Sequence, residues 1–271
     1  MNQPNVDIPV VILAGGQGTR IREVTPSLPK PMLDIGGRPI IWHIMKHYAH
    51  YGYKRFIICL GYMGEQIKNF FLNYRAATSD FTMRLGAPDS IEYHSDCDEC
   101  DWVVTLVDTG LNTMTGGRVG RIRDYITTDH FMLTYGDGVA DVDLADLWRF
   151  HLAHGKIGTV TGVHPPGRFG DLMLSGKQVT DFSEKRQVTE GVINGGFFVF
   201  RRQFLTDYLS PSETLILERE PLERLAHDGE LMCYVHQGFW QCMDTARDYN
   251  FLNELWRTGQ AKWLIPDSRN L

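Results

Sequence analysis

A short apolar run that ends in a glycine-rich loop, VVILAGGQGTR at residues 10–20, limits the possible folds of this chain more than any other stretch. Val10–Leu13 is apolar and mostly β-branched, which is typical of a strand buried on both faces of a parallel sheet. The glycines that follow let the backbone turn tightly and bring its N–H groups close to an anion. This combination predicts an α/β protein with a polyphosphate-binding loop. A plain tight turn is the alternative that local chemistry leaves open.

Two well-known phosphate-binding loops do not match this one. The Walker sequence Gly-Lys-Ser/Thr is absent, and Ile21 stands where the dinucleotide fingerprint has its third glycine. Prolines at positions 26, 29 and 31 oppose a helix and favour an extended lid over the ligand. Lys30 lies between two of these prolines, and the stiff backbone holds its ammonium group at low entropic cost, which suits a fixed phosphate contact.

Strands and helices alternate over the first 163 residues. Apolar spacing predicts helices at residues 40–52, 65–74, 115–126 and 144–154, and buried strands at residues 55–60, 102–108, 131–135 and 157–163. This order predicts right-handed crossovers and a mostly parallel sheet that binds its ligand beyond the carboxyl ends of the strands. After residue 165, shorter strands separated by glycines predict a smaller antiparallel sublayer over that opening.

Composition excludes several classes of function. The chain has 271 residues, 43% apolar and 22% charged, as ordinary globular proteins do. Its net charge of -6 and the lack of a basic run argue against nucleic acid as a partner. No apolar stretch approaches the roughly 18 residues of a membrane span, and the N-terminus MNQPNVD lacks the features of a signal peptide. We therefore expect a cytoplasmic protein with no membrane partner.

The cysteines predict neither a disulfide framework nor a metal centre. Five cysteines are an odd number in a chain without a secretion signal. Cys97 and Cys100 form a C-x-x-C with His94 nearby, but no second ligand pair follows at zinc spacing. We interpret residues 76–101 as an irregular polar excursion from the sheet whose thiols are incidental.

Two aspartates are candidate metal ligands. Asp137 lies between two glycines after the predicted strand at residues 131–135, where its carboxylate is able to hold a hydrated cation. Asp244 precedes the last predicted helix and can join Asp137 on one Mg²⁺. The alternatives are an Asp-Gly turn for Asp137 and a helix N-cap for Asp244.

Further candidate ligand-binding residues lie in the second half of the chain. Glu184 and Lys185 follow a predicted strand, where a carboxylate suits hydroxyl groups and an ammonium suits a phosphate; an exposed ion pair is the alternative. Asn194, with two glycines after it, interrupts an apolar strand at a point where a ligand can approach closely, although a bulge would give the same pattern.

The motifs AGGQGTR and LPKPMLDIGGRPII, with WVVTLVDTG, TMTGGR, TYGDGVAD, PPGRFG, INGGFF and GFWQCMDT, resemble the sugar-1-phosphate nucleotidyltransferases over nearly the whole chain, and the glucose-1-phosphate cytidylyltransferase branch in particular. The resemblance implies a Rossmann-like, GT-A-like α/β fold in a single domain. Residues 8–163 would mainly bind nucleotide, and residues 164–271 would mainly bind sugar and form a homo-oligomer. It further implies that CTP and α-D-glucose 1-phosphate give CDP-glucose and pyrophosphate with Mg²⁺, for CDP-linked deoxysugars of surface polysaccharides.

The resemblance also implies roles for individual residues. The triphosphate would lie on the glycine loop and its neighbours: Leu13, Gly15, Gly16, Gly18, Thr19, Arg20 and Lys30. The cytosine would lie at Thr115, Gly116 and Arg118, and the Mg²⁺ at Asp137 and Asp244. The sugar phosphate would be held by Glu184, Lys185 and Asn194, with Gly170 lining the pocket. The catalytic cations would be Arg20, Lys30 and Lys185.

Two positions depart from the family pattern. Arg186 follows Glu184 and Lys185 where the family has a proline, and Cys242 stands where a proline is expected before Met-Asp-Thr. Both departures lie on the sugar side of the pattern. Two alternatives are therefore kept: a nucleotidyltransferase for another base or sugar 1-phosphate, and a non-catalytic nucleotide-sugar sensor. A sensor has no need of two metal carboxylates, so Asp137 and Asp244 together favour an enzyme.

Overall fold

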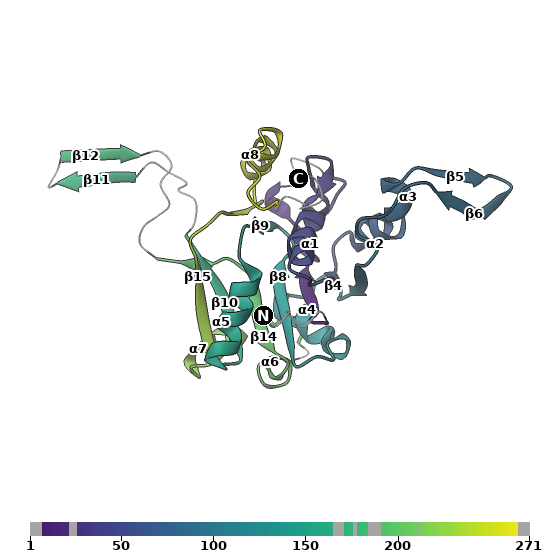
Figure 1. Ribbon diagram of the computed structural model, residues 1–271. Coiled ribbons are helices and arrows are strands. Elements are labelled where there is room, and N and C mark those ends of the chain that lie inside the picture. Colours follow the sequence, from purple (N-terminus) through teal and green to yellow (C-terminus); the bar gives the residue numbers. More distant parts are fainter. Residues whose placement is uncertain are drawn as a thin grey trace.

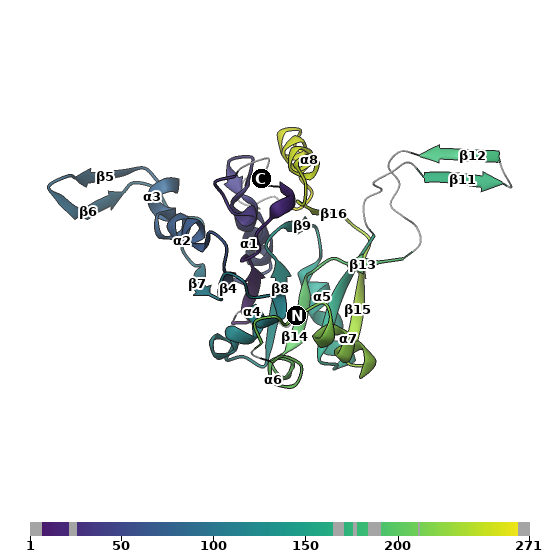
Figure 2. The same ribbon diagram turned by 180° about the vertical axis from the view of Figure 1, so that it is seen from behind.

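The protein is built around one eight-stranded sheet (Figures 1 and 2). The structure, a computed structural model, describes residues 7–21, 26–164, 171–175, 178–183, 191–210 and 212–264. The strands of the sheet are β1 (Val10–Leu13), β4 (Arg55–Leu60), β7 (Val103–Asp108), β8 (His130–Tyr135), β10 (Gly158–Val163), β13 (Ile193–Asn194), β14 (Phe198–Arg201) and β15 (Leu231–His236).

Strands β8, β1, β4 and β7 lie side by side and run parallel. Strand β14 is antiparallel between β8 and β10, and β15 pairs with β10 in parallel. The sheet is thus mixed and mostly parallel, which confirms the predicted fold class. In the parallel block the carboxyl ends of four strands meet at one edge.

Successive residues of the central strands pack on opposite faces of the sheet. In β1, Val10 and Ile12 belong to one buried cluster and Val11 and Leu13 to another. The first cluster includes residues of α1 (Ile40–His50), α5 (Leu144–His154) and α8 (Ala246–Arg257). The second includes residues of α4 (Thr115–Arg121), α6 (Gln203–Asp207) and α7 (Glu220–His227). Because helices cover both faces, these strands are apolar throughout rather than alternating.

Local signals mark the ends of the long helices. The Asp143 side chain accepts a hydrogen bond from the Asp146 N–H at 2.9 Å and caps the start of α5, and Gly155, with a φ of +67°, is the C-cap residue. Helix α8 begins with a capping box between Thr245 and Asp248. The predicted strand at residues 55–60 and helix at residues 144–154 are confirmed at both ends.

The interpretation of residues 76–101 as irregular is wrong. After α2 (Gly64–Leu72) and α3 (Tyr74–Thr78), strands β5 (Phe81–Arg84) and β6 (Ala87–Tyr93) form an antiparallel hairpin that extends away from the sheet (Figure 1). Phe81 lies opposite Tyr93, with their ring centroids 5.8 Å apart. Every residue of β5 is exposed, so the segment has no buried face and no continuous apolar run to mark a strand.

Three further two-stranded ladders complete the described structure. They are β2 (Asp34–Ile35) with β3 (Arg38–Pro39), β9 (Gly138–Ala140) with β16 (Trp240–Cys242), and β11 (Asp171–Ser175) with β12 (Gln178–Ser183). Within the described residues, no helix has both the length and the apolar character needed to span a membrane.

Three buried histidines stay neutral in the folded protein. The Nε2 atoms of His43 and His47 lie 2.9 Å from the Ile35 and Val142 carbonyls, and His151 Nδ1 lies 2.8 Å from Thr159 Oγ1. Burial lowers the pKa of His43 and His47 to about 4, and that of His151 to about 3. These imidazoles therefore make the folded state sensitive to acid.

We expect the free energy of unfolding to fall as the pH drops from about 6.5, the pKa of an unfolded histidine, towards 4. In this window the unfolded chain binds protons that the folded chain excludes, at about 1.4 kcal/mol per pH unit for each histidine. Urea unfolding at a series of pH values measures the slope. His47→Gln should give a shallower slope, whereas exposed His50→Gln, on the same helix, should not. Equal slopes in both variants would contradict the assignment.

Candidate active site

The topology brings two predicted site segments to one edge of the sheet. The glycine loop follows β1, and the turn at Gly136 and Asp137 follows β8, its parallel neighbour. The Gly136 N–H donates to the Leu13 carbonyl at 3.0 Å, which extends the pairing past the ends of both strands. Ligands of α/β sheets bind at this kind of edge.

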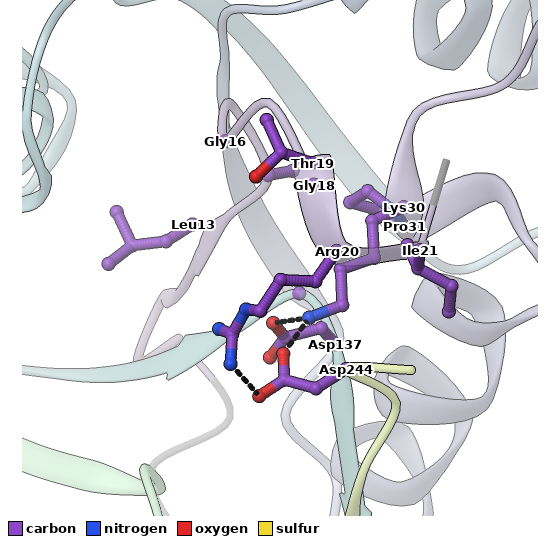
Figure 3. Close-up of a pocket in the computed structure, with 12 residues that line it drawn as sticks. Leu13, Gly16, Gly18, Thr19, Arg20, Ile21, Lys30, Pro31, Asp137 and Asp244 are labelled. Atoms are coloured by element: carbon purple, nitrogen blue, oxygen red, sulfur yellow. Dashed lines mark hydrogen bonds and ion pairs between the residues drawn. The ribbon is translucent and has the colours of Figure 1, made fainter. Parts of the chain in front are cut away.

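A pocket opens at this edge (Figure 3). It is lined by Leu13, Ala14, Gly16, Gly18, Thr19, Arg20, Ile21, Lys30, Pro31, Gly136, Asp137 and Asp244. The structure thus brings together the residues that the sequence predicts for the triphosphate and the metal, with the exception of Gly15. Most of the lining is backbone and polar side chain, as an anion needs.

The glycines of the loop differ in what they do. Gly18 has a φ of +55°, in the left-handed region that favours glycine, and it leads into a short 3₁₀ helix at Thr19–Ile21. Gly16 is exposed, and a Cβ there would meet nothing within 4 Å, so a ligand can approach its backbone. Gly15 is buried instead, and a Cβ there would overlap the Arg118 guanidinium. Gly15 therefore serves packing beneath the loop.

The pairing of β9 with β16 brings the two aspartates together. Asp137 immediately precedes β9 and Asp244 follows β16, in which Cys242 lies opposite Gly138. The Met243 N–H donates to the Asp137 carbonyl at 2.8 Å and closes the pair. The N-cap alternative for Asp244 is wrong, because Thr245 caps α8. Asp137 does lie in a turn, and its side chain points into the pocket (Figure 3).

Lys30 lies between the two carboxylates. Its Nζ is 2.6 Å from Asp137 Oδ2 and contacts Asp244 Oδ1, while Arg20 Nη1 is 3.2 Å from Asp244 Oδ2. The Lys30 side chain is 11% exposed and that of Arg20 71%, so only Arg20 is largely in solvent. Burial lowers the pKa of Lys30, but the two aspartates outweigh it and raise the pKa above its usual value. Lys30 is therefore a fixed positive charge.

The two aspartates fit a divalent cation. Their oxygens already converge on one cationic atom, the Lys30 ammonium, and carboxylate oxygens are what Mg²⁺ prefers. Among the residues that the structure describes, no group of three or more potential protein ligands gathers here or elsewhere. A cation at Asp137 and Asp244 would need further oxygens from phosphate or water, which is usual for Mg²⁺.

The predicted base-binding residues lie beneath the loop rather than around an open cavity. Arg118 is 4% exposed and donates to the Leu60, Gly110 and Gly15 carbonyls at 2.8, 2.8 and 3.0 Å. It also donates to Thr109 Oγ1 at 2.8 Å and to the Leu111 carbonyl at 3.3 Å. One guanidinium therefore joins the segments that follow β1, β4 and β7. A role for Arg118 in reading a base stays a prediction.

The start of α4 is covered by residues 212–218. A Cβ on Gly116 would lie 2.9 Å from Leu215 Cγ, so glycine is needed for this close packing. Thr115 Oγ1 donates to Glu218 Oε2 at 2.7 Å and accepts from the Leu217 N–H at 2.9 Å. The N-cap residue of α4 is Met114, and its side chain makes no capping hydrogen bond.

Of the predicted sugar-binding residues, only Asn194 lies within the described part of the chain. The predicted interruption of the strand is confirmed: β13 ends at Asn194 and β14 begins at Phe198. Asn194 is exposed, its Oδ1 accepts from the Gly196 N–H at 2.9 Å, and its Nδ2 donates to the Tyr135 hydroxyl at 3.0 Å. The other candidates, Gly170, Glu184 and Lys185, lie outside the described residues.

Two residues near the pocket were missed by the sequence analysis. The Tyr135 hydroxyl donates to Glu218 Oε1 at 2.7 Å, so Glu218 accepts from Thr115 and Tyr135 at once. The one sequence feature that could have identified Tyr135 is its position directly before the Gly-Asp-Gly motif. Glu218 belongs to no recognisable motif.

We expect Arg118→Met to destabilise the protein. Methionine fills much of the space but leaves buried carbonyls without donors, at about 1–3 kcal/mol for each group that water cannot reach. Urea unfolding should therefore show a loss of several kcal/mol. Arg123→Met is the matched control, because Arg123 is exposed in the short 3₁₀ helix, Arg123–Tyr125, that follows α4. Equal stability of the two variants would contradict the structural role of Arg118.

Comparisons with known proteins agree with this geometry. Residues 9–256 match the family model described as nucleotidyl transferase. A glucose-1-phosphate cytidylyltransferase of Salmonella typhi is 50% identical over 254 residues, which are 93% of this chain and 97% of the relative. A probable glucose-1-phosphate cytidylyltransferase of Bacillus subtilis is 42% identical over 94% of this chain and 98% of the relative.

Solved structures share the fold. HddC from Yersinia pseudotuberculosis superimposes with a TM-score of 0.68 at 23% identity, over 92% of this chain and 99% of that one. A putative glucose-1-phosphate thymidylyltransferase from Bacillus anthracis superimposes with a TM-score of 0.65 at 15% identity, over 97% and 98% of the two chains. With the family match over residues 9–256, the conclusion is that this chain belongs to the nucleotidyl transferase family.

Proposed function

We propose that this protein transfers a cytidylyl group from CTP to α-D-glucose 1-phosphate, giving CDP-glucose and pyrophosphate. The observation that carries the proposal is the 50% identity to the Salmonella typhi glucose-1-phosphate cytidylyltransferase over 93% of this chain. The pocket supports it, because Arg20, Lys30, Asp137 and Asp244 gather beside an exposed glycine loop. The same activity in the cytoplasm would supply CDP-linked deoxysugars for surface polysaccharides.

The triphosphate would lie along the glycine loop. Gly16 and Gly18 offer backbone at the pocket, and Thr19 and Arg20 are exposed beside them. The exposed Arg20 side chain is able to leave Asp244 for a phosphate at low cost, because an exposed ion pair is worth about 0–1 kcal/mol. Leu13 would line the floor, where the pocket meets the sheet.

The reaction is an in-line displacement. A phosphate oxygen of the sugar phosphate attacks the α-phosphorus of CTP, and pyrophosphate leaves. The attacking oxygen is already anionic at neutral pH, so none of the histidines is needed as a general base. The barrier is mainly repulsion between anions, and the protein lowers it by holding Arg20, Lys30 and, on the sugar side, Lys185 as fixed positive charges.

We propose Mg²⁺ as the cofactor, held by Asp137 and Asp244. When bound, it supplies positive charge to the phosphates that react. Lys30 contacts both carboxylates and offsets part of the repulsion between them. With a cation held by Asp137 and Asp244, the ammonium of Lys30 would be able to contact a phosphate within the same pocket.

We also propose that the protein is a homo-oligomer. The β5–β6 hairpin carries exposed apolar side chains away from the sheet, among them Phe81, Met83, Leu85 and Ile91. Leu85 is 86% exposed at the tip of the hairpin. An apolar patch of this kind is typical of a surface that a partner covers.

A panel of nucleotides and sugar phosphates tests the substrates. CTP with glucose 1-phosphate should release pyrophosphate at least about tenfold faster than ATP, GTP, UTP or dTTP, because a pocket built for one base leaves polar groups unpaired with another. A coupled pyrophosphate assay measures each rate. A faster reaction with another nucleotide or sugar would establish the alternative transferase. Tight binding without turnover would establish the sensor.

Asp137→Asn should lower turnover by a factor on the order of 10²–10³, because the cation that would bring positive charge to the reacting phosphates loses a carboxylate ligand. The fold should stay intact, since the side chain is at the pocket surface. Isothermal titration with Mn²⁺ and CTP gives a readout besides activity, and the variant should bind the metal more weakly. Asp124→Asn is the control, because Asp124 is exposed. Unchanged metal binding in Asp137→Asn would exclude the metal site.

A further inference from the structure

Glu218 lies between two residues that the family resemblance gives to different substrates, Thr115 to the cytosine and Asn194, a hydrogen-bond partner of Tyr135, to the sugar phosphate. Its carboxylate accepts from Thr115 Oγ1 at Oε2 and from the Tyr135 hydroxyl at Oε1, both at 2.7 Å. Thr115 opens α4, the segment proposed for the base, and Tyr135 ends β8. Hydrogen bonds to a charged acceptor are about twice as strong as neutral ones, so this double contact is a firm link.

On the base side, the link is anchored by backbone contacts. Besides the bond from the Leu217 N–H to Thr115 Oγ1, the Gly117 N–H donates to the Leu215 carbonyl at 3.1 Å and the Met114 N–H to the Glu213 carbonyl at 2.8 Å. The segment that carries Glu218 is therefore fixed to the start of α4. A displacement of α4 by a nucleotide would move Glu218 with it.

On the sugar side, the chain of contacts continues to Asn194. Asn194 Nδ2 donates to the Tyr135 hydroxyl at 3.0 Å, and the Tyr135 ring packs against Gly196, where a Cβ would lie 3.1 Å from Cδ2. The Tyr135 hydroxyl thus accepts from Asn194 and donates to Glu218. Asn194 itself is exposed, where a sugar can reach it.

We propose that Glu218 is a positioning residue that couples the two substrates, so that nucleotide bound at the start of α4 strengthens binding of the sugar phosphate at Asn194. This rests on the proposed function, since it needs both ligands to bind this protein. The coupling is carried by one continuous path of hydrogen bonds, from Thr115 through Glu218 and Tyr135 to Asn194. Glu218 touches neither the reacting atoms nor the metal ligands, so it acts only through its two hydroxyl partners.

Calorimetry on the full chain tests the coupling. Glucose 1-phosphate is titrated with and without a saturating non-hydrolysable CTP analogue, with Mg²⁺ present. In the unaltered protein the nucleotide should tighten sugar phosphate binding at least about fivefold, the low end of usual coupling between sites. In Glu218→Met the ratio should fall close to one while each ligand alone binds nearly as before, because a thioether replaces both carboxylate oxygens that accept from the two hydroxyls. Glu223→Met, at an exposed glutamate in α7, should keep the coupling.

A second variant separates coupling from folding. Tyr135→Phe removes only the hydroxyl, and we expect it to abolish the same coupling. The double variant should show no further loss, because both changes break one path. A merely structural role would lower the melting temperature and leave the ratio unchanged in variants that fold.

Each outcome decides between the proposals. Coupling that persists in Glu218→Met or Tyr135→Phe overturns the positioning role, as does a ratio of one in the unaltered protein. In both cases turnover of CTP and glucose 1-phosphate would leave the proposed function standing. Failure of both ligands to bind the unaltered protein would overturn the two proposals together.

Discussion

The contact of one ammonium with two carboxylates sets the geometry of the whole pocket. Lys30, Asp137 and Asp244 are separated by 107 residues or more in sequence, yet they meet because β1 is parallel to β8 and β9 pairs with β16. Two carboxylates this close would repel each other without a cation between them. The strand pairing can therefore bring them together only because Lys30 stands there, or because a metal replaces it.

A second buried cation supports the glycine loop from below. Lys30 faces the pocket and is neutralised by aspartates, whereas Arg118 bonds to carbonyls and to one hydroxyl on the inner side of the loop. Gly15 and Gly61 have no room for a side chain because the guanidinium lies against both. The loop thus lies between the Lys30 ammonium on the pocket side and the Arg118 guanidinium on the inner side.

The sequence predicted what depends on local pattern and missed what depends on contacts through space. Val10–Leu13 and Arg55–Leu60 were readable because buried strands leave continuous apolar runs. The β5–β6 hairpin was not, because its exposed strands leave no such run. The sequence around Arg118 would be the same whether its side chain faced a base or a set of carbonyls. Its burial could therefore not be predicted from the sequence. Glu218 acts on residues 83 and 103 positions away, and no spacing rule reaches that far.

The end of β8 shows why the pocket behaves as one unit. Tyr135, Gly136 and Asp137 are consecutive, so the link towards the sugar side and the proposed metal ligand share one stretch of backbone. Gly136 is buried, and a Cβ there would lie 2.9 Å from the Leu13 carbonyl, at the start of the glycine loop. This stretch cannot shift without moving the loop as well. Tyr135, Asp137 and the glycine loop are therefore joined through one stretch of backbone. A ligand that displaces one of them changes the positions of the others, and this is the physical condition for coupling between sites.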